Sequence, residues 1–339
     1  MQRSTKSTDI SNPGDLVSVI VVNWNGRHYL HDCLTALSVQ TAAEYEVVLV
    51  DNASTDGSVE FVAEHFPSVR IVRNDRNRGF AAANNIGFQH ARGNYLVTLN
   101  NDTCANPDWL AELVKGVHTG PDIGMCASTM VLRSDPSIVD STGIAFNRCG
   151  VAWDRLSGCR LSDINPQPVE VFGPCAGAAM YRREMIDQVG GFDEDFFIYL
   201  EDVDLAWRAQ SHGWRCLSIP AAVVQHVHSG TSREGSPGKN YNLGRNKVWM
   251  LYKNLSAAQL GWLPLILLYD FSAALYSLYL YRNWWSIRGR IAGLRGLKGM
   301  KLKRHNSLKD AQPPSRWVRL LEQLEPPWRL AGQFAQRRH

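Results

Sequence analysis

The sequence lacks the common signatures of a phosphate, zinc or disulfide site. It contains neither GxGxxG nor GxxxxGKS/T, so a dinucleotide site and a P-loop lose their main support. Its seven cysteines are an odd number without a CxxC pair, which argues against a disulfide framework and a thiolate zinc site. Residues 1–15 have no apolar signal region, and we expect a short disordered leader there. These absences favour a cytoplasmic protein with reduced, mostly buried thiols.

Acidic residues are scarce near the C-terminus. Residues 282–339 carry 14 Lys and Arg against 3 Asp and Glu, a net charge of +11. Residues 1–281 carry 22 Lys and Arg against 29 Asp and Glu. The overall net charge of +4 is therefore the sum of an acidic body and a basic end. A basic end indicates an anionic partner. Few aromatic residues are interleaved there and no nucleic-acid motif occurs, so we expect phospholipid and no nucleic acid.

Apolar runs rich in β-branched residues alternate with helical patterns in the first hundred residues. Such continuous runs are typical of strands buried on both faces. Their alternation with helices predicts an α/β fold with a doubly wound, mostly parallel sheet flanked by helices. The expected strands cover 17–22, 46–50, 69–72 and 95–99, and the expected helices cover 28–40, 58–66 and 80–91.

The loops that follow these strands are polar, as expected where a parallel sheet binds its ligand. Asp51 directly follows the second strand, where a carboxylate can accept a hydrogen bond from a base or ribose; the alternative is a turn residue. Asp102 follows the fourth strand, where it can hold a hard cation against a diphosphate; the alternative is a helix cap. The small residues of GFAAANNIG (79–87) allow close approach of a ligand or of another backbone.

Residues 190–214 place six carboxylates among aromatic and apolar side chains. Carboxylates beside apolar surface can have raised pKa values and can accept protons near neutral pH. The alternative is a helix start, where acidic residues offset the helix dipole. In such a helix Glu201 and Asp202 point in directions about 100° apart. The six carboxylates belong to Asp193, Glu194, Asp195, Glu201, Asp202 and Asp204.

These segments, in this order, resemble the inverting nucleotide-sugar glycosyltransferases of family 2, which have the GT-A fold. Their bacterial rhamnosyltransferase-like branch is the most similar. The resemblance covers residues 17–254 and depends on the combined order and spacing of its motifs. The motifs are VSVIVVNWNG, VVLVDNASTDGS, RNRGFAAANNIG, LNNDT, GGFDEDFFIYLEDVDLAWR and YNLGRN.

The resemblance implies roles for particular residues. Asp202 aligns with the catalytic base, with Glu201 beside it. Asp102 matches the last carboxylate of the family's DxD metal motif, whose first position is Asn100 here. His226 matches a downstream histidine that completes the metal or diphosphate site, with His228 as the alternative, and the implied cation is Mg²⁺ or Mn²⁺. The implied donor contacts are Asn23, Asn25, Asp51, Arg78, Gly79, Asn84, Asn101 and Arg245.

The implied reaction is a single displacement. Asp202 takes a proton from an acceptor hydroxyl, which attacks the anomeric carbon of a nucleotide diphospho-sugar and inverts it. The first expectation for the donor is dTDP-L-rhamnose, with UDP- and GDP-sugars open. The acceptor is a saccharide or a polyprenyl-diphosphate-linked saccharide of a bacterial cell-surface polysaccharide. The alternative is a non-catalytic nucleotide-sugar-binding or scaffold protein on the same fold.

Residues 260–281 are the most apolar segment of the chain. They are long enough to span a bilayer, but Asp270 near the middle costs about 3 kcal/mol there. A single span would also send the basic end outside. We therefore expect a helix in the membrane plane, at the inner face of the cell membrane, with a buried packing helix or a homodimer contact as the alternative. The expected divisions are a glycosyltransferase domain (16–255), membrane-associating helices (256–299) and a basic tail (300–339).

Overall fold

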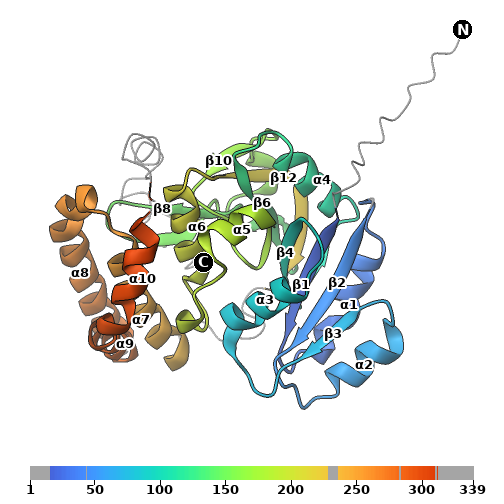
Figure 1. Ribbon diagram of the computed structural model, residues 1–339, viewed down its shortest axis with the longest axis horizontal. Helices are drawn as coiled ribbons and strands as arrows, with labels where there is room; N and C mark the ends of the chain where they lie inside the picture. Colours follow the sequence, from blue (N-terminus) through green and yellow to red (C-terminus); the bar gives the residue numbers. More distant parts are fainter. Residues whose placement is uncertain (1–15, 43, 228–235, 282–283, 310, 312–339) are drawn as a thin grey trace, which may run out of the picture.

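The computed structural model describes residues 16–42, 44–227, 236–281, 284–309 and 311, and a ten-stranded sheet lies at its centre (Figure 1). The candidate ligand His228 lies outside the described residues. Along its main path the sheet has the strand order β10-β12-β6-β11-β4-β1-β2-β3. Two further strands pair with this path, β5 with β12 and β7 with β6.

The first hundred residues form the parallel half of this sheet. β3 (Arg70–Arg73), β2 (Tyr45–Asp51), β1 (Val17–Asn23) and β4 (Tyr95–Asn100) pair in parallel, in that order. They alternate with α1 (Arg27–Ser38), α2 (Ser58–His65) and α3 (Gly79–His90). The predicted alternation of strands and helices is confirmed. The parallel register brings the carboxyl ends of β2, β1 and β4 to one edge, because Asn23 pairs with Asp51 and Val22 with Asn100.

The second half of the sheet is mixed. β11 (Ala178–Arg182) runs antiparallel between β4 and β6 (Ile123–Leu132), and β12 (Arg215–His226) is parallel to β6. β5 (Thr103–Ala105), β7 (Asp135–Ser141) and β10 (Val169–Val171) pair antiparallel with their neighbours. β8 (Ile144–Phe146) and β9 (Ala152–Asp154) form a separate pair. The helices of this half are α4 (Trp109–Val117), α5 (Arg183–Val189) and α6 (Glu201–Ser211), with short 3₁₀ turns at Leu161–Asp163 and Glu194–Phe196.

Hydrophobic cores cover both faces of the sheet. Successive residues of β1 enter different cores. Ile20 belongs to the cluster that contains side chains of α3 and α6, whereas Val21 belongs to the cluster that contains side chains of α1 and α4. This alternation is the physical reason that the apolar run of β1 is continuous. The core that contains Ile20 holds α6 against its face of the sheet, where the N-terminus of this helix carries Glu201 and Asp202.

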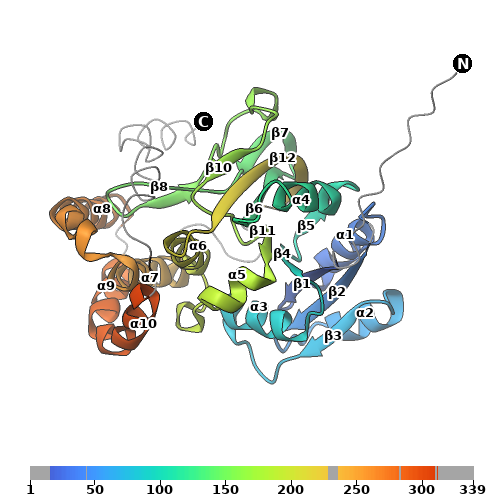
Figure 2. The ribbon, with the colours of Figure 1, turned by 45° about the horizontal axis from the view of Figure 1, so that its top comes forward.

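Four helices form one end of the molecule (Figures 1 and 2). They are α7 (Pro237–Asn254), α8 (Leu263–Tyr281), α9 (Trp285–Arg295) and α10 (Leu297–Lys309), with a 3₁₀ turn at Ala257–Trp262 before α8. α7 and α9 are in backbone contact, because a Cβ on Gly289 would lie 2.1 Å from the Tyr241 carbonyl oxygen. Residues 300–309, the first part of the expected basic tail, belong to α10. Within the described part of the chain, no helix has the length and apolar character needed to cross a membrane.

Candidate active site

Buried hydrogen bonds connect the carboxyl ends of β4, β1 and β2. Asn101 donates from Nδ2 to Asn23 Oδ1 at 2.7 Å, and Asn23 donates from Nδ2 to Asp51 Oδ1 at 3.2 Å. None of these three side chains is more than 7% exposed. The other oxygen of Asp51 accepts from the backbone N–H of Ser54 at 3.0 Å. The structure thus brings three predicted donor contacts into one line, because parallel strands end at the same edge.

Asn25 joins the loops after β1 and β2. Its backbone N–H donates to Ser54 Oγ at 2.9 Å, and its side-chain oxygen accepts from the Thr55 N–H at 2.8 Å. Asn25 adopts a left-handed conformation with φ 51°, which asparagine tolerates better than most residues. Both polar loops therefore have fixed positions over the strand ends.

Three further predicted donor contacts interact with nearby groups of the protein in this structure: Arg78, Gly79 and Asn84. The Arg78 guanidinium pairs with Asp75 at 2.8 Å, and the Asn84 amide donates to the Phe80 carbonyl of its own helix at 3.0 Å. Gly79 has φ 84°, and an added Cβ would lie 2.5 Å from the Phe197 ring. The small residues of GFAAANNIG were expected to allow close approach of another group. Among the described residues, that group is Phe197 of the acidic segment, residues 190–214.

The acidic segment is attached to the start of α3. The N–H groups of Phe80 and Ala81 both donate to the Phe197 carbonyl, at 2.7 and 3.2 Å. Asn85 donates from Nδ2 to the Phe192 carbonyl at 2.8 Å and accepts from the Phe192 N–H at 2.9 Å. Asn85, next to the predicted Asn84, thus provides the amide that connects these segments.

The backbone immediately before α6 is strained. Phe197, Tyr199 and Leu200 have φ values of 64°, 74° and 65°, which side-chain-bearing residues rarely adopt. Each such residue costs about 1–3 kcal/mol and persists only where its surroundings enforce it. This unusual turn places Glu201 and Asp202 at the first positions of α6.

Asn246 of α7 holds that turn in place. It is fully buried, and its Nδ2 group donates to the carbonyls of Phe196, Ile198 and Tyr199 at 3.0, 3.0 and 2.7 Å. Asn246 was not among the predicted site residues, although it belongs to the YNLGRN motif. Its partners lie 47 to 50 residues away, so the sequence held no local signal for this role.

Arg245 contacts the same turn. It donates from Nη2 to the Phe196 carbonyl at 2.9 Å and from Nε to Asn246 Oδ1 at 2.9 Å, and its guanidinium stacks 4.6 Å from the Trp249 ring centroid. The family resemblance implied a donor contact for this arginine. In the structure these two donor groups are directed at the protein.

Asp202 has the environment of a base that works near neutral pH. Burial raises its pKa to about 6, although it accepts hydrogen bonds from the N–H groups of Ala176 and Val203 at 3.2 and 2.8 Å. Burial and the neighbouring Asp202 charge raise the pKa of Glu201 well above its usual range. One Glu201 oxygen has no hydrogen-bond partner among the described residues. Of this pair, Asp202 is therefore the carboxyl that ionises more readily.

A glycine-containing loop, residues 173–177, connects Asp202 to the end of β4. Ala176 donates its N–H to Asp202, and the Gly177 carbonyl accepts from the Asn100 N–H at 2.8 Å. Cys175 immediately precedes Ala176 in this loop. Burial raises the pKa of its thiol, and the charges of Asp154, Asp202 and Asp140 raise it further. Asp202, the end of β4 and the carboxylates of Asp154 and Asp140 are therefore all close to one short loop.

Asp102 and His226 lie side by side at the pairing of β5 with β12. His226 Nε2 is 3.4 Å from Asp102 Oδ1, while its Nδ1 forms a 2.7 Å hydrogen bond with Asp140. Burial alone would lower the pKa of His226, but the two carboxylates raise it to about 10. Asp102 Oδ1 is buried without a hydrogen-bond partner in the described part of the chain. Asp140 was not predicted, because it lies 86 residues from its partner.

Asp102 and His226 could supply only part of the ligand set of a cation. Among the described residues no group of three or more His, Cys, Asp and Glu side chains could hold a metal ion. A two-ligand site agrees with Mg²⁺ sites completed by substrate phosphates. Asp102 Oδ1 makes no regular hydrogen bond besides its 3.4 Å contact with His226 Nε2, and these two atoms could ligate a cation once the imidazolium gives up its proton. Asp140 would then orient the ring as carboxylates commonly do for metal-bound histidine.

Asp204, on the same helix as Asp202, belongs to a buried network of charged side chains. It is completely buried and accepts hydrogen bonds from Arg208, Lys253 and Asn254 at 2.9, 2.9 and 2.8 Å. Burial opposes its ionisation, but Lys253 and Arg208 lower its pKa to about 2. Asp193 accepts from Lys253 at 2.5 Å and from Lys303 of α10. α7 therefore contacts both Asp193 and Asp204, and α10 contacts Asp193.

Comparison with known proteins agrees with this geometry. The family model Glycosyl transferase family 2 matches residues 18–190. Over 234 residues the chain is 27% identical to the N-acetylglucosaminyl-diphospho-decaprenol L-rhamnosyltransferase of Mycobacterium tuberculosis, covering 62% of this chain and 76% of that protein.

Solved structures share the fold. GalNAc-T7 with UDP, GalNAc and Mn²⁺ has a TM-score of 0.58 at 20% identity, covering 72% of this chain and 48% of that one. S. aureus TarS 1–349 has a TM-score of 0.57 at 17% identity, covering 93% of this chain and 91% of that one. These likenesses support the GT-A-like arrangement of the sheet and its helices. With a family model that spans half of its length, the chain belongs to glycosyl transferase family 2.

Proposed function

We propose that this glycosyltransferase transfers a sugar from a nucleotide diphospho-sugar to an acceptor hydroxyl with inversion of the anomeric centre. The observation that carries the proposal is Asp202, a carboxylate with a pKa of about 6 at the start of α6. It lies one short loop away from the end of β4, where the donor is expected. A base with this pKa is largely ionised at neutral pH and still accepts a proton from a hydroxyl as that hydroxyl attacks.

The donor lies, in this proposal, over the carboxyl ends of β1, β2 and β4. Asn23, Asn25, Asp51 and Asn101 provide fixed polar groups there, and a carboxylate retains acceptor capacity beyond its two present bonds. Arg78, Gly79 and Asn84 shape the border of the site through α3. Arg245 acts mainly by holding the turn before Asp202. Glu201, with its raised pKa, supplies a neutral carboxyl next to the base.

Asp102 and His226 would hold a divalent cation, Mg²⁺ or Mn²⁺, together with the donor diphosphate. When bound, such a cation neutralises negative charge that develops on the leaving diphosphate. GalNAc-T7, which shares the fold, was crystallised with Mn²⁺, and an imidazole ligand is compatible with that ion. Asp140 keeps Nε2 of His226 turned toward Asp102.

For the donor sugar we propose L-rhamnose from dTDP-L-rhamnose, and for the acceptor a polyprenyl-diphosphate-linked saccharide. The support is the mycobacterial relative, whose name gives an L-rhamnosyl group and an N-acetylglucosaminyl-diphospho-decaprenol acceptor. Its identity of 27% leaves UDP- and GDP-sugars as the competing donors in the test.

The test is a donor panel with a membrane lipid extract as acceptor, read by nucleotide release and by the anomeric configuration of the product. We expect release with dTDP-L-rhamnose and an inverted linkage. Asp202→Asn should abolish release while donor binding persists, and Asp187→Asn on the exposed side of α5 is the matched control. A retained configuration would contradict the single displacement. Donor binding without transfer by the wild type would indicate a binding or scaffold protein instead.

A further inference from the structure

α8 exposes a broad apolar face. Its exposed large side chains are 38% to 84% accessible, although such residues normally lie inside a protein. Contiguous apolar surface of this kind marks an interaction site. We call these residues the α8 face: Leu263, Leu265, Leu267, Leu268, Phe271, Leu275 and Tyr279.

The only acidic residue of α8 is turned into the protein. Asp270 accepts two hydrogen bonds from Arg290 of α9, both at 2.7 Å, and pairs with Lys247 of α7 at 2.8 Å. Burial opposes its ionisation, but Arg290 and Lys247 lower its pKa to about 2. The negative charge of Asp270, which would oppose contact with a membrane, is therefore neutralised by Arg290 and Lys247. The α8 face itself carries no charged residue.

The two helices that follow add positive charge at the same end of the molecule (Figures 1 and 2). Residues 284–309 contain no Asp or Glu. Trp284 and Trp285 are 60% and 42% exposed at the start of α9, a residue type common at the level of lipid headgroups. The exposed cations of α9 and α10 are Arg288, Arg295, Lys298, Lys301 and Lys309.

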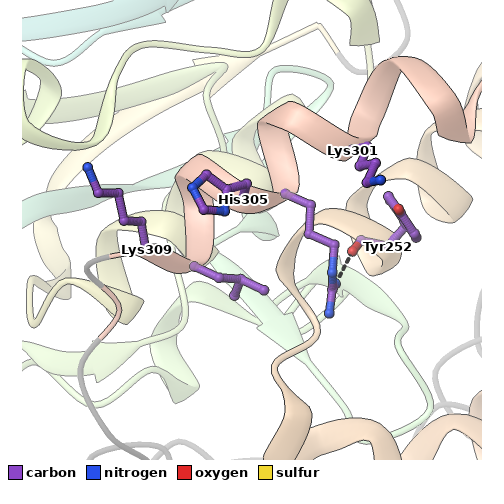
Figure 3. A pocket seen from close by; sticks show the side chains of 6 residues that line it. Tyr252, Lys301, His305 and Lys309 are labelled. Atoms are coloured by element: carbon purple, nitrogen blue, oxygen red, sulfur yellow. Dashed lines mark hydrogen bonds between the residues drawn. The ribbon is translucent and has the colours of Figure 1, made fainter.

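An open groove of about 410 Å³ continues this basic surface between α7 and α10 (Figure 3). Three cationic side chains and a histidine line it, together with Tyr252 and Leu308. The Arg304 guanidinium is fixed there, since it donates to the Tyr252 carbonyl and lies 5.4 Å from the Tyr252 ring centroid. The cationic residues of the groove are Lys301, Arg304 and Lys309, and the histidine is His305.

We propose that the α8 face inserts into the headgroup region of an anionic lipid bilayer and that the cations of α9 and α10 bind its phosphates. The apolar side chains at this end of the molecule suit the acyl boundary of a bilayer, and the cations suit its anionic headgroups. A second copy of the chain would bring two sets of cations together. A nucleic acid would leave the leucines of α8 exposed. Docking brings the active site to a lipid-linked acceptor, a consequence that rests on the proposed function, whereas lipid binding itself does not.

The first test is vesicle flotation of the full chain, with phosphatidylcholine alone or mixed with phosphatidylglycerol. We expect flotation with the anionic mixture that weakens as salt is added. Leu267→Glu combined with Phe271→Glu changes two residues that are 59% and 64% exposed, so the fold should persist. The partition coefficient should fall at least tenfold, since each withdrawn apolar side chain accounts for roughly that factor. Val39→Glu, at a 56% exposed position on the catalytic domain, is the matched control and should float like the wild type.

The second test removes charge. Arg295→Gln and Lys298→Gln should each weaken binding to anionic vesicles about fivefold and leave the weak binding to neutral vesicles unchanged. Transfer to a water-soluble acceptor should stay at the wild-type rate in every variant, so a failed glycosyltransferase assay is distinguishable from failed docking. Equal flotation of wild type and the Leu267→Glu, Phe271→Glu variant would overturn the proposal. A wild-type dimer that this variant converts to monomer in sedimentation would identify the α8 face as a contact between copies, and would also overturn it.

Discussion

Lys253→Met removes one partner from the buried charge network around Asp204 of α6. Lys253 is 2% exposed, and its ammonium group contacts Asp193 at 2.5 Å and Asp204 at 2.9 Å. Methionine has a similar length and fills the same space beside Phe196, but it carries no charge. The substitution therefore leaves Asp204 fully buried with Arg208 and Asn254 as its remaining partners.

The expected loss in the free energy of unfolding is about 3 kcal/mol. Removing one partner of a buried pair costs about 3–5 kcal/mol, and the remaining Arg208 keeps the loss near the lower limit. The lowered pKa of Asp204 agrees in direction with a loss of stability. It lies at about 2 instead of 3.8, and the Lys253 charge is the largest of the effects that lower it.

The pH dependence has a definite sign. Because the folded-state pKa of Asp204 is lowered, its contribution is complete above about pH 4 and is lost as the pH falls toward 2. Without Lys253 this pKa should rise toward its usual value. The difference in stability between wild type and Lys253→Met should therefore be largest near neutral pH and shrink in acid.

The assay is urea denaturation followed by far-ultraviolet circular dichroism at several pH values. Lys115→Met is the control, because Lys115 forms a similar pair with Glu112 on an exposed surface of α4 and should lose less than about 1 kcal/mol. A loss for Lys253→Met no larger than that of Lys115→Met would refute the reasoning. So would a stability difference that stays constant down to acid pH.

Four further outcomes follow from the site. Asp202→Asn should lower kcat by about 10²–10⁴-fold with donor affinity unchanged, as measured by calorimetry and steady-state kinetics; normal turnover would remove the base assignment. The wild-type kcat should fall as the pH drops through about 6, because the raised pKa means that Asp202 is protonated below it; a flat profile from pH 5 to 7 would contradict this. Asn246→Ala should cost about 1–3 kcal/mol of stability and lower kcat more than it raises the donor KM, while an unchanged kcat would show that the turn holds without it. Asp102→Ala should abolish Mn²⁺ binding measured by titration calorimetry in the presence of nucleoside diphosphate, and Asp140→Asn should weaken it about 10–100-fold; tight binding in both variants would place the cation elsewhere.

The parallel half of the fold could be predicted because its signals are local. Continuous apolar runs such as that of β1 reveal a strand buried on both faces, and a polar residue at its end indicates the ligand edge. Asp51 was predicted in this way, whereas Asn23 and Asn101 came from the family resemblance. The structure places the three together because parallel strands end at the same edge. The antiparallel strand β11 has no comparable sequence signal, because its short sequence does not specify that it lies between β4 and β6.

The residues that fix the active site were harder to predict. Asn246 contacts a turn about 50 residues before it, and Lys303 reaches Asp193 across 110 positions. Such pairs leave no periodic pattern. Arg245 shows the same limitation: its side chain suits a phosphate, but the packing of α7 directs two of its donor groups to the backbone before Asp202 and to Asn246.

The sequence by itself determined the strand and helix alternation, the polar strand ends, the acidic segment and the separation of an acidic body from a basic end. These follow from side-chain polarity and from periods of two and 3.6 residues, which any short window contains. Only the tertiary structure decided that Asp202 ionises more readily than Glu201, that Asp140 orients His226, and that Asp270 faces inward while leucines of α8 face out. Each of these depends on burial and on charges from distant segments, which exist only once the chain has folded.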